Sequence, residues 1–79
     1  MPEIAREFGF SIVIYPNDHE PMHVHVKKAG SEVKINAKTL ELMSIKGNIS
    51  NKGVRKAIAL VASYQALISK KWKEIHGQL

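Results

Sequence analysis

Cysteine is absent from the 79-residue chain, which excludes a disulfide framework and a zinc site built on thiolates. A chain this short buries only about 60% of its unfolded surface, so we expect one domain, residues 1–79, with an economical core. Its stability then comes from packing, from a metal held by other ligands, or from a partner subunit. The lack of cysteine fits a reducing cytosol, and we expect a cytoplasmic protein.

Long apolar runs are also missing. The longest ones, residues 12–15 and 57–62, fall far short of the roughly 20 residues that a membrane helix needs. The N-terminal residues 1–7 include early acidic side chains and no apolar run behind a basic start, so no secretory signal is predicted. We therefore expect a soluble protein that has no membrane partner.

Acidic residues are outnumbered: seven Asp and Glu stand against 12 Lys and Arg, which gives a net charge of +5. This excess favours anionic partners such as nucleic acid or an acidic protein, although many small domains carry similar charge only for solubility. Aromatic side chains are few, with one Trp, two Tyr and two Phe, so no platform for stacking bases is predicted.

Apolar and polar residues alternate with period two in three segments, about 8–15, 22–28 and 32–37, which predicts three short strands. Turn-forming residues separate them at 16–18 and 28–31, so the strands form an antiparallel meander with one buried face. The inward-facing set is Phe8, Phe10, Ile12, Ile14, Met22, Val24, Val26, Val33, Ile35 and Ala37. Residues 38–49 stay unassigned, because 40–45 fits a strand, a helical turn or an irregular edge.

A long C-terminal helix is predicted over about 51–76. Ser50 has the chemistry of an N-cap, Gly77 that of a stop, and apolar residues recur between them at spacings of three and four. Trp72 falls on the apolar stripe, and His76 is placed to cap carbonyl groups at the helix end. The predicted class is α+β, a three-stranded antiparallel sheet covered on one face by this helix.

Histidines cluster in the run Asp18-His19-Glu20-Pro21-Met22-His23-Val24-His25. His23 and His25 are two apart on the second predicted strand, so both point to one face, roughly 6.5–7 Å apart. That face is opposite the core and is expected to be open to solvent. His19 lies in the preceding loop and can fold back toward the pair.

Several interpretations of these histidines stay open. His19, His23 and His25, together with a carboxylate, can bind zinc or another divalent metal, the one cofactor considered. Alternatively, His23 and His25 act as acid and base on a phosphodiester, since imidazole titrates near neutral pH. The third interpretation is that they are exposed polar residues that contact a partner or nothing. A structural role, such as holding the loop, is the fourth.

Two groups of basic residues are candidates for binding nucleic acid. Lys27 and Lys34 are expected on the histidine face. Lys52, Arg55 and Lys56 fall in the first turns of the helix, where positive charge opposes the helix dipole at a cost of about 0.3–1 kcal/mol per group. A basic helix start suits phosphate, but a solvated face explains the same residues.

The histidine run, the N-terminal residues 1–4, the strand 9–15 and Trp72 resemble the small bacterial proteins of the domain-of-unknown-function family 4160. Members typically carry Asp-His-x-Pro-Pro-His-x-His-Val, and Met22 replaces the second proline here. The resemblance covers nearly the whole chain. It implies a prokaryotic or phage-related source, a gene arrangement like a toxin–antitoxin pair, and a signature role for His19, His23 and His25. It implies no established activity.

Three functional hypotheses follow from these patterns. The first is a toxin–antitoxin-type component that binds RNA and cleaves it with His23 or His25. The second is a non-catalytic module whose histidine face meets the neighbouring small protein, and a homodimer is a further alternative. The third is a small metal-binding domain.

Overall fold

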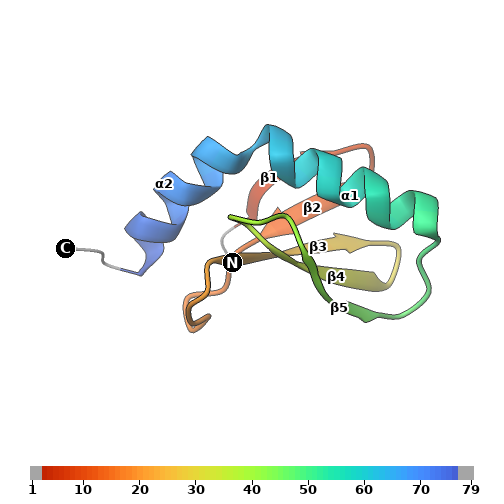
Figure 1. Ribbon diagram of the computed structural model, residues 1–79, viewed down its shortest axis with the longest axis horizontal. Helices are drawn as coiled ribbons and strands as arrows, with labels where there is room; N and C mark the ends of the chain where they lie inside the picture. The colour runs from red at the N-terminus through yellow and green to blue at the C-terminus, as the bar shows by residue number, and fades with distance from the viewer. Residues whose placement is uncertain (1–2, 77–79) are drawn as a thin grey trace.

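The computed structural model describes residues 3–76, which form five strands followed by two helices. The elements are β1 (Glu3–Glu7), β2 (Phe10–Val13), β3 (His23–Lys28), β4 (Ser31–Asn36), β5 (Leu42–Lys46), α1 (Asn51–Ser63) and α2 (Gln65–Ile75). The strands pair antiparallel in chain order, and both helices lie on one face of the sheet (Figure 1). The predicted α+β class and antiparallel sheet are confirmed, but the three-stranded sheet and the single helix over 51–76 are wrong.

Two-residue turns connect β1 to β2 and β3 to β4. Phe8 and Gly9 have φ angles of 53° and 80°, and Ala29 and Gly30 have φ angles of 46° and 82°. Positive φ angles at both central residues are characteristic of a type I′ turn. Its twist matches the right-handed twist of the two strands that it connects. The strand predicted over 8–15 therefore starts too early, because Phe8 belongs to a turn and its side chain is 68% exposed.

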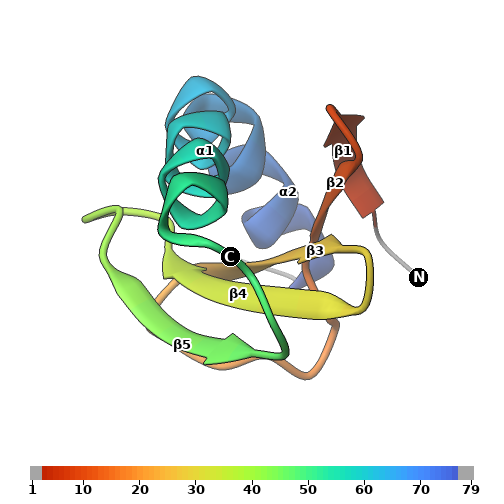
Figure 2. The same ribbon diagram turned by 90° about the vertical axis from the view of Figure 1, so that its right-hand side faces the viewer.

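β1 was not predicted, and β5 was only one of the alternatives for residues 40–45, because neither edge strand shows a clean period of two. The pairing of β1 with β2 shifts between Glu3 and Ala5, and that of β4 with β5 shifts between Lys34 and Ile35. Such an irregularity displaces the side-chain alternation by one residue. β5 is exposed along its whole length, and Figure 2 shows it at the sheet edge, away from both helices.

The core lies between the helices and β2, β3 and β4. Alternate residues of these strands face the helices, which supply apolar side chains at spacings of three and four. The buried set comprises Phe10, Ile12, Ile14, Val24, Val26, Val33, Ile35, Ala37, Ala57, Leu60, Val61, Ile68 and Trp72. Apart from Phe8 and the partly buried Met22, the predicted inward-facing strand residues are all in this core.

The predicted helix is divided at Tyr64, where φ is −112° and ψ is 12°. The Ser63 hydroxyl donates to the Leu60 carbonyl oxygen at 2.8 Å, a local bond that is known to bend helices. The bend directs α2 around the end of the sheet, where Gln65 Nε2 donates to the Ala37 carbonyl at 2.9 Å. The Tyr64 hydroxyl donates to Glu7 at 2.7 Å, which ties the bend to β1.

Side chains cap the start of α1 and the end of α2, as the sequence predicted. Ser50 caps α1, since its Oγ accepts the Gly53 N–H at 3.0 Å. His76 caps α2 through its Nδ1, 3.0 Å from the Trp72 carbonyl. The predicted stop at Gly77 lies outside the described residues. Among residues 3–76, no helix is long and apolar enough to span a membrane.

Candidate functional site

The loop between β2 and β3 holds Asp18 in a fixed position. The backbone N–H of Tyr15 donates to Asp18 Oδ2 at 3.0 Å, and the N–H of Asp18 donates to the Tyr15 carbonyl at 3.0 Å. Aspartate side chains commonly hydrogen-bond to nearby backbone groups in turns. The loop therefore brings the Asp18 carboxylate back toward the start of β3.

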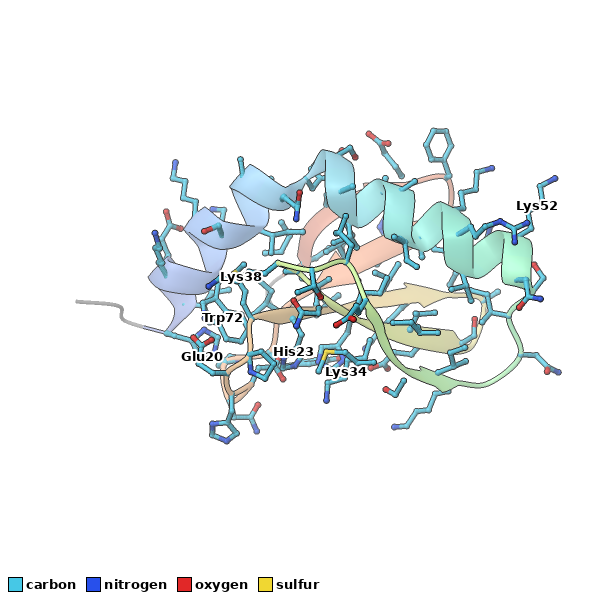
Figure 3. The ribbon with its side chains drawn as sticks, viewed as in Figure 1. Glu20, His23, Lys34, Lys38, Lys52 and Trp72 are labelled. Carbon is cyan, nitrogen blue, oxygen red and sulfur yellow. The ribbon has the colours of Figure 1, made fainter. Side chains whose placement is uncertain are left out.

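His23 is buried, with 5% of its surface exposed, although the sequence predicted an open position. The strand alternation places it on the face opposite the core, as expected, but α2 reaches around the sheet end to cover it. The Trp72 ring lies 5.7 Å from the His23 ring, centre to centre, in an edge-on arrangement (Figure 3). His23 Nδ1 is 2.8 Å from the Pro21 carbonyl oxygen.

His25 is half-buried and contacts carboxylates through both ring nitrogens. Its Nδ1 is 2.7 Å from Glu32 Oε2, and its Nε2 is 3.3 Å from Asp18 Oδ1. The Tyr15 ring packs edge-on against it at 4.7 Å between ring centres. His25 is thus fixed in position from three sides.

Asp18, His23 and His25 form one compact group, called here the histidine–aspartate cluster. His23 Nε2 lies 3.4 Å from the same Asp18 oxygen that faces His25, and one ligand atom from each residue falls within 4.8 Å of the others. Burial acts to raise the pKa of Asp18. It is outweighed by the hydrogen bond from the Tyr15 N–H and by the contacts with His25 and His23, so this pKa lies below its ordinary value.

His19 is not brought into the cluster. It is exposed in the loop, where it lines a shallow hollow with Asp18, His23 and Lys34. The site residues predicted from the sequence did not include Asp18 or Glu32, although Asp18 opens the histidine run. The signal for Glu32 was available, since the alternation places it on the histidine face beside Lys34.

Basic side chains occupy the sheet face that the helices leave uncovered. The strand register aligns Arg6, Ser11, Lys27, Glu32 and Lys46 in one row across all five strands. Lys34 pairs with His25 and Ser44 in the adjacent row. The first row lines a hollow of about 370 Å³, to which Lys28 and Ser31 also contribute. We call this surface the basic sheet face: Arg6, Lys27, Lys34 and Lys46.

Lys27 and Lys34 lie on this face as predicted, whereas Lys52, Arg55 and Lys56 lie elsewhere. The latter three are exposed in the first turns of α1, and Figure 3 shows Lys52 at the far end of the molecule from His23. Lys56 Nζ lies 5.5 Å from the centre of the Phe8 ring. The structure therefore separates the predicted basic residues into two surfaces.

Among comparisons with known proteins, only the one with protein families gives a match. The curated proteins yield none, and neither do the solved structures. Residues 9–73 match the family described as Domain of unknown function (DUF4160), a range that includes β2 to β5, the whole histidine–aspartate cluster and Trp72. Because the match covers most of the 79 residues, the chain belongs to the DUF4160 family.

Proposed function

We propose that this protein binds RNA on its basic sheet face, as the RNA-directed member of a toxin–antitoxin-type pair. The observation that supports it is the row of cations Arg6, Lys27 and Lys46 on β1, β3 and β5. Alternate strands lie about 10 Å apart, so these cations can contact separate phosphates of one chain. Lys27 Nζ lies 4.9 Å from the centre of the Tyr15 ring, and the interaction with the Tyr15 side chain raises the pKa of Lys27 above its ordinary value.

The polar groups between the cations favour RNA over DNA. Ser11 lines the same hollow, and its hydroxyl, which makes only a long 3.4 Å contact with Glu3, can donate to a phosphate or sugar oxygen. The Ser31 hydroxyl is buried and already donates to the Lys28 carbonyl at 2.7 Å. Glu32 lies between Lys27 and Lys46 in the row, where a carboxylate repels phosphate but accepts a hydrogen bond from a ribose 2′-hydroxyl. A chain with 2′-hydroxyls therefore suits the row better than one without them.

The geometry favours binding over cleavage. An acid–base pair has to present free nitrogen atoms to the substrate. His23 is almost fully covered, and both nitrogens of His25 already contact carboxylates. We therefore assign the histidines a structural role beside the basic sheet face, and its lysines the proposed contacts with RNA.

Two matched variants test this proposal. Replacing Lys27, Lys34 and Lys46 by glutamine removes three charges from the basic sheet face. Replacing Lys52, Arg55 and Lys56 by glutamine removes three charges from α1. Fluorescence anisotropy with a single-stranded RNA, at 50–200 mM salt, measures the affinity of each variant, with DNA of the same sequence as a further arm.

The sheet-face variant is expected to bind about 10–100-fold more weakly near 0.1 M salt. The slope of log K against log salt is expected to become shallower by about 2, since each phosphate contact to a single strand contributes about 0.7. The α1 variant keeps near-wild-type affinity. Equal losses in the two variants, or a loss confined to the α1 variant, would contradict the proposal.

A second candidate function, self-association along β5, is favoured by the composition of that edge. Leu42, Met43 and Ile45 are 43%, 40% and 46% exposed. An edge strand with apolar side chains and free backbone groups can pair with another strand, whereas charged edges resist pairing. The opposite edge, β1, carries such charges in Glu3 and Arg6, which form an ion pair at 2.8 Å.

We expect the pure protein to sediment as a dimer at about 100 μM and an Ile45→Lys variant as a monomer, because a lysine blocks edge pairing. The control is Phe8→Lys, which changes a more exposed apolar side chain, 68% against 46% for Ile45, in the turn before β2. A wild type that sediments as a monomer would remove this candidate.

A further inference from the structure

We infer that the histidine–aspartate cluster is a divalent metal site with Asp18 Oδ1, His23 Nε2 and His25 Nε2 as ligands. This inference goes beyond RNA binding and concerns a different set of side chains. The ligand set also differs from the one that the sequence predicted, because Asp18 supplies the carboxylate and His19 is not a ligand.

The hydrogen-bond partners of the two Nδ1 atoms show which nitrogen of each imidazole carries a hydrogen. A backbone carbonyl only accepts hydrogen bonds, so His23 Nδ1, 2.8 Å from the Pro21 oxygen, carries a hydrogen. The Glu32 carboxylate likewise accepts from His25 Nδ1 at 2.7 Å. In the neutral form of each ring, the lone pair is therefore on Nε2.

Both Nε2 atoms face one carboxylate oxygen, Asp18 Oδ1, at 3.4 and 3.3 Å. Three lone-pair atoms that converge without a hydrogen between them repel one another unless a cation lies at their centre. Protons on the imidazoles are one such cation, but charge-assisted N–H···O bonds are about 2.7–2.9 Å long. Both distances are longer than that.

A metal ion accounts for the two distances to Asp18 Oδ1, and the three ligand atoms, which lie within 4.8 Å of one another, would close around the ion on binding. Bonds of about 2.0–2.1 Å from zinc to nitrogen or oxygen in a tetrahedron place neighbouring ligand atoms about 3.4 Å apart. The Nδ1 atoms of His23 and His25 contact the Pro21 carbonyl and the Glu32 carboxylate. In metal-bound imidazoles, the nitrogen that does not bind the metal likewise donates to a carboxylate or a backbone carbonyl. The cluster thus has both the ligands and the groups that orient them.

The donor set indicates the class of metal. Two imidazoles and one carboxylate suit Zn²⁺ and other late first-row divalent ions, and three protein ligands leave a fourth position for water or an exogenous anion. Two hollows of about 220 Å³ flank the cluster, one at His25 and the other at Asp18 and His23. Lys34 lines both, so an anion in the fourth position would be adjacent to its positive charge.

The test is calorimetric titration of the untagged full chain with ZnCl₂ at neutral pH, without RNA. The wild type is expected to bind one Zn²⁺ per chain, and Asp18→Asn and His25→Gln each lower the affinity by at least about 100-fold. Glu32→Gln, which alters the partner of His25, is expected to lower it by about 10–100-fold. The control is His19→Ala, a nearby exposed histidine, whose affinity should stay within about two-fold of the wild type.

Circular dichroism checks that each variant is folded. If either Asp18→Asn or His25→Gln fails to fold, the other variant still tests the ligand set. Absence of Zn²⁺ binding by the wild type overturns the inference. A folded Asp18→Asn that binds like the wild type, or a His19→Ala that loses as much affinity as Asp18→Asn, overturns the ligand set. Because no RNA is present, failure here is distinguishable from failure of the RNA proposal.

Discussion

Replacing Trp72 by alanine is expected to destabilise the protein by about 3–5 kcal/mol, the range found when a buried aromatic side chain is truncated. Trp72 is only 4% exposed, and its Nε1 donates to Glu20 Oε2 at 3.2 Å. Its ring packs against His23 and against His76, whose centre lies 4.0 Å away. One side chain thus joins α2 to the loop that carries the candidate site.

The stability expected to be lost in Trp72→Ala is a large part of the total free energy of unfolding. A domain of this size has a free energy of unfolding of about 4–12 kcal/mol, so the variant is expected to be partly or wholly unfolded at 25 °C. The matched control is Trp72→Phe, which keeps an apolar ring but loses the hydrogen bond to Glu20, at an expected cost of about 1–2 kcal/mol. Urea unfolding measures both. A loss below 1 kcal/mol for Trp72→Ala would show that the contact is not part of the core.

The second large effect is expected at Gly47, which connects β5 to the helical layer. Its φ is +84°, a left-handed conformation that costs other residues about 1–2 kcal/mol. A Cβ atom added there would lie 3.0 Å from the Gly30 carbonyl oxygen and 3.1 Å from Ser31 Cα. Since both neighbours are backbone, they cannot rotate away, and Gly47→Ala should cost about 2–4 kcal/mol in total.

Gly30 provides a matched control within the same turn region. Its φ is +82°, nearly that of Gly47, but no atom lies within 4 Å of an added Cβ. Gly30→Ala therefore shows the conformational strain alone, about 1–2 kcal/mol. The difference between the two variants in urea unfolding isolates the steric clash. Equal losses would mean that the approach of Gly47 to the β3–β4 turn is not tight.

The sequence predicted the centre of the sheet better than its edges. Val24, Val26, Val33 and Ile35 alternate cleanly because β3 and β4 each have one buried and one polar face. β1 and β5 have no such contrast, since one is partly charged and the other is exposed throughout. The bend at Tyr64 was also missed, because it depends on side-chain bonds and not on a proline or glycine.

The candidate site could be predicted only in part. Period two correctly placed His23 and His25 on the face opposite the core, with Lys34 and Asn36 as neighbours. It could not show that Trp72, far along the chain, covers His23, because alternation gives the direction of a side chain and not what packs over it. Nor could it show which loop residue turns inward, and the structure brings in Asp18 where the sequence suggested His19.

The central proposal is that RNA binds the basic sheet face, and a titration followed by NMR tests it most directly. Assigned amide spectra of the wild type, recorded while a single-stranded RNA is added, locate the contact residue by residue. We predict the largest shift changes at Lys27, Lys34 and Lys46, with little change at Lys52, Arg55 and Lys56. Changes confined to the start of α1, or none at saturating RNA, would contradict the proposal.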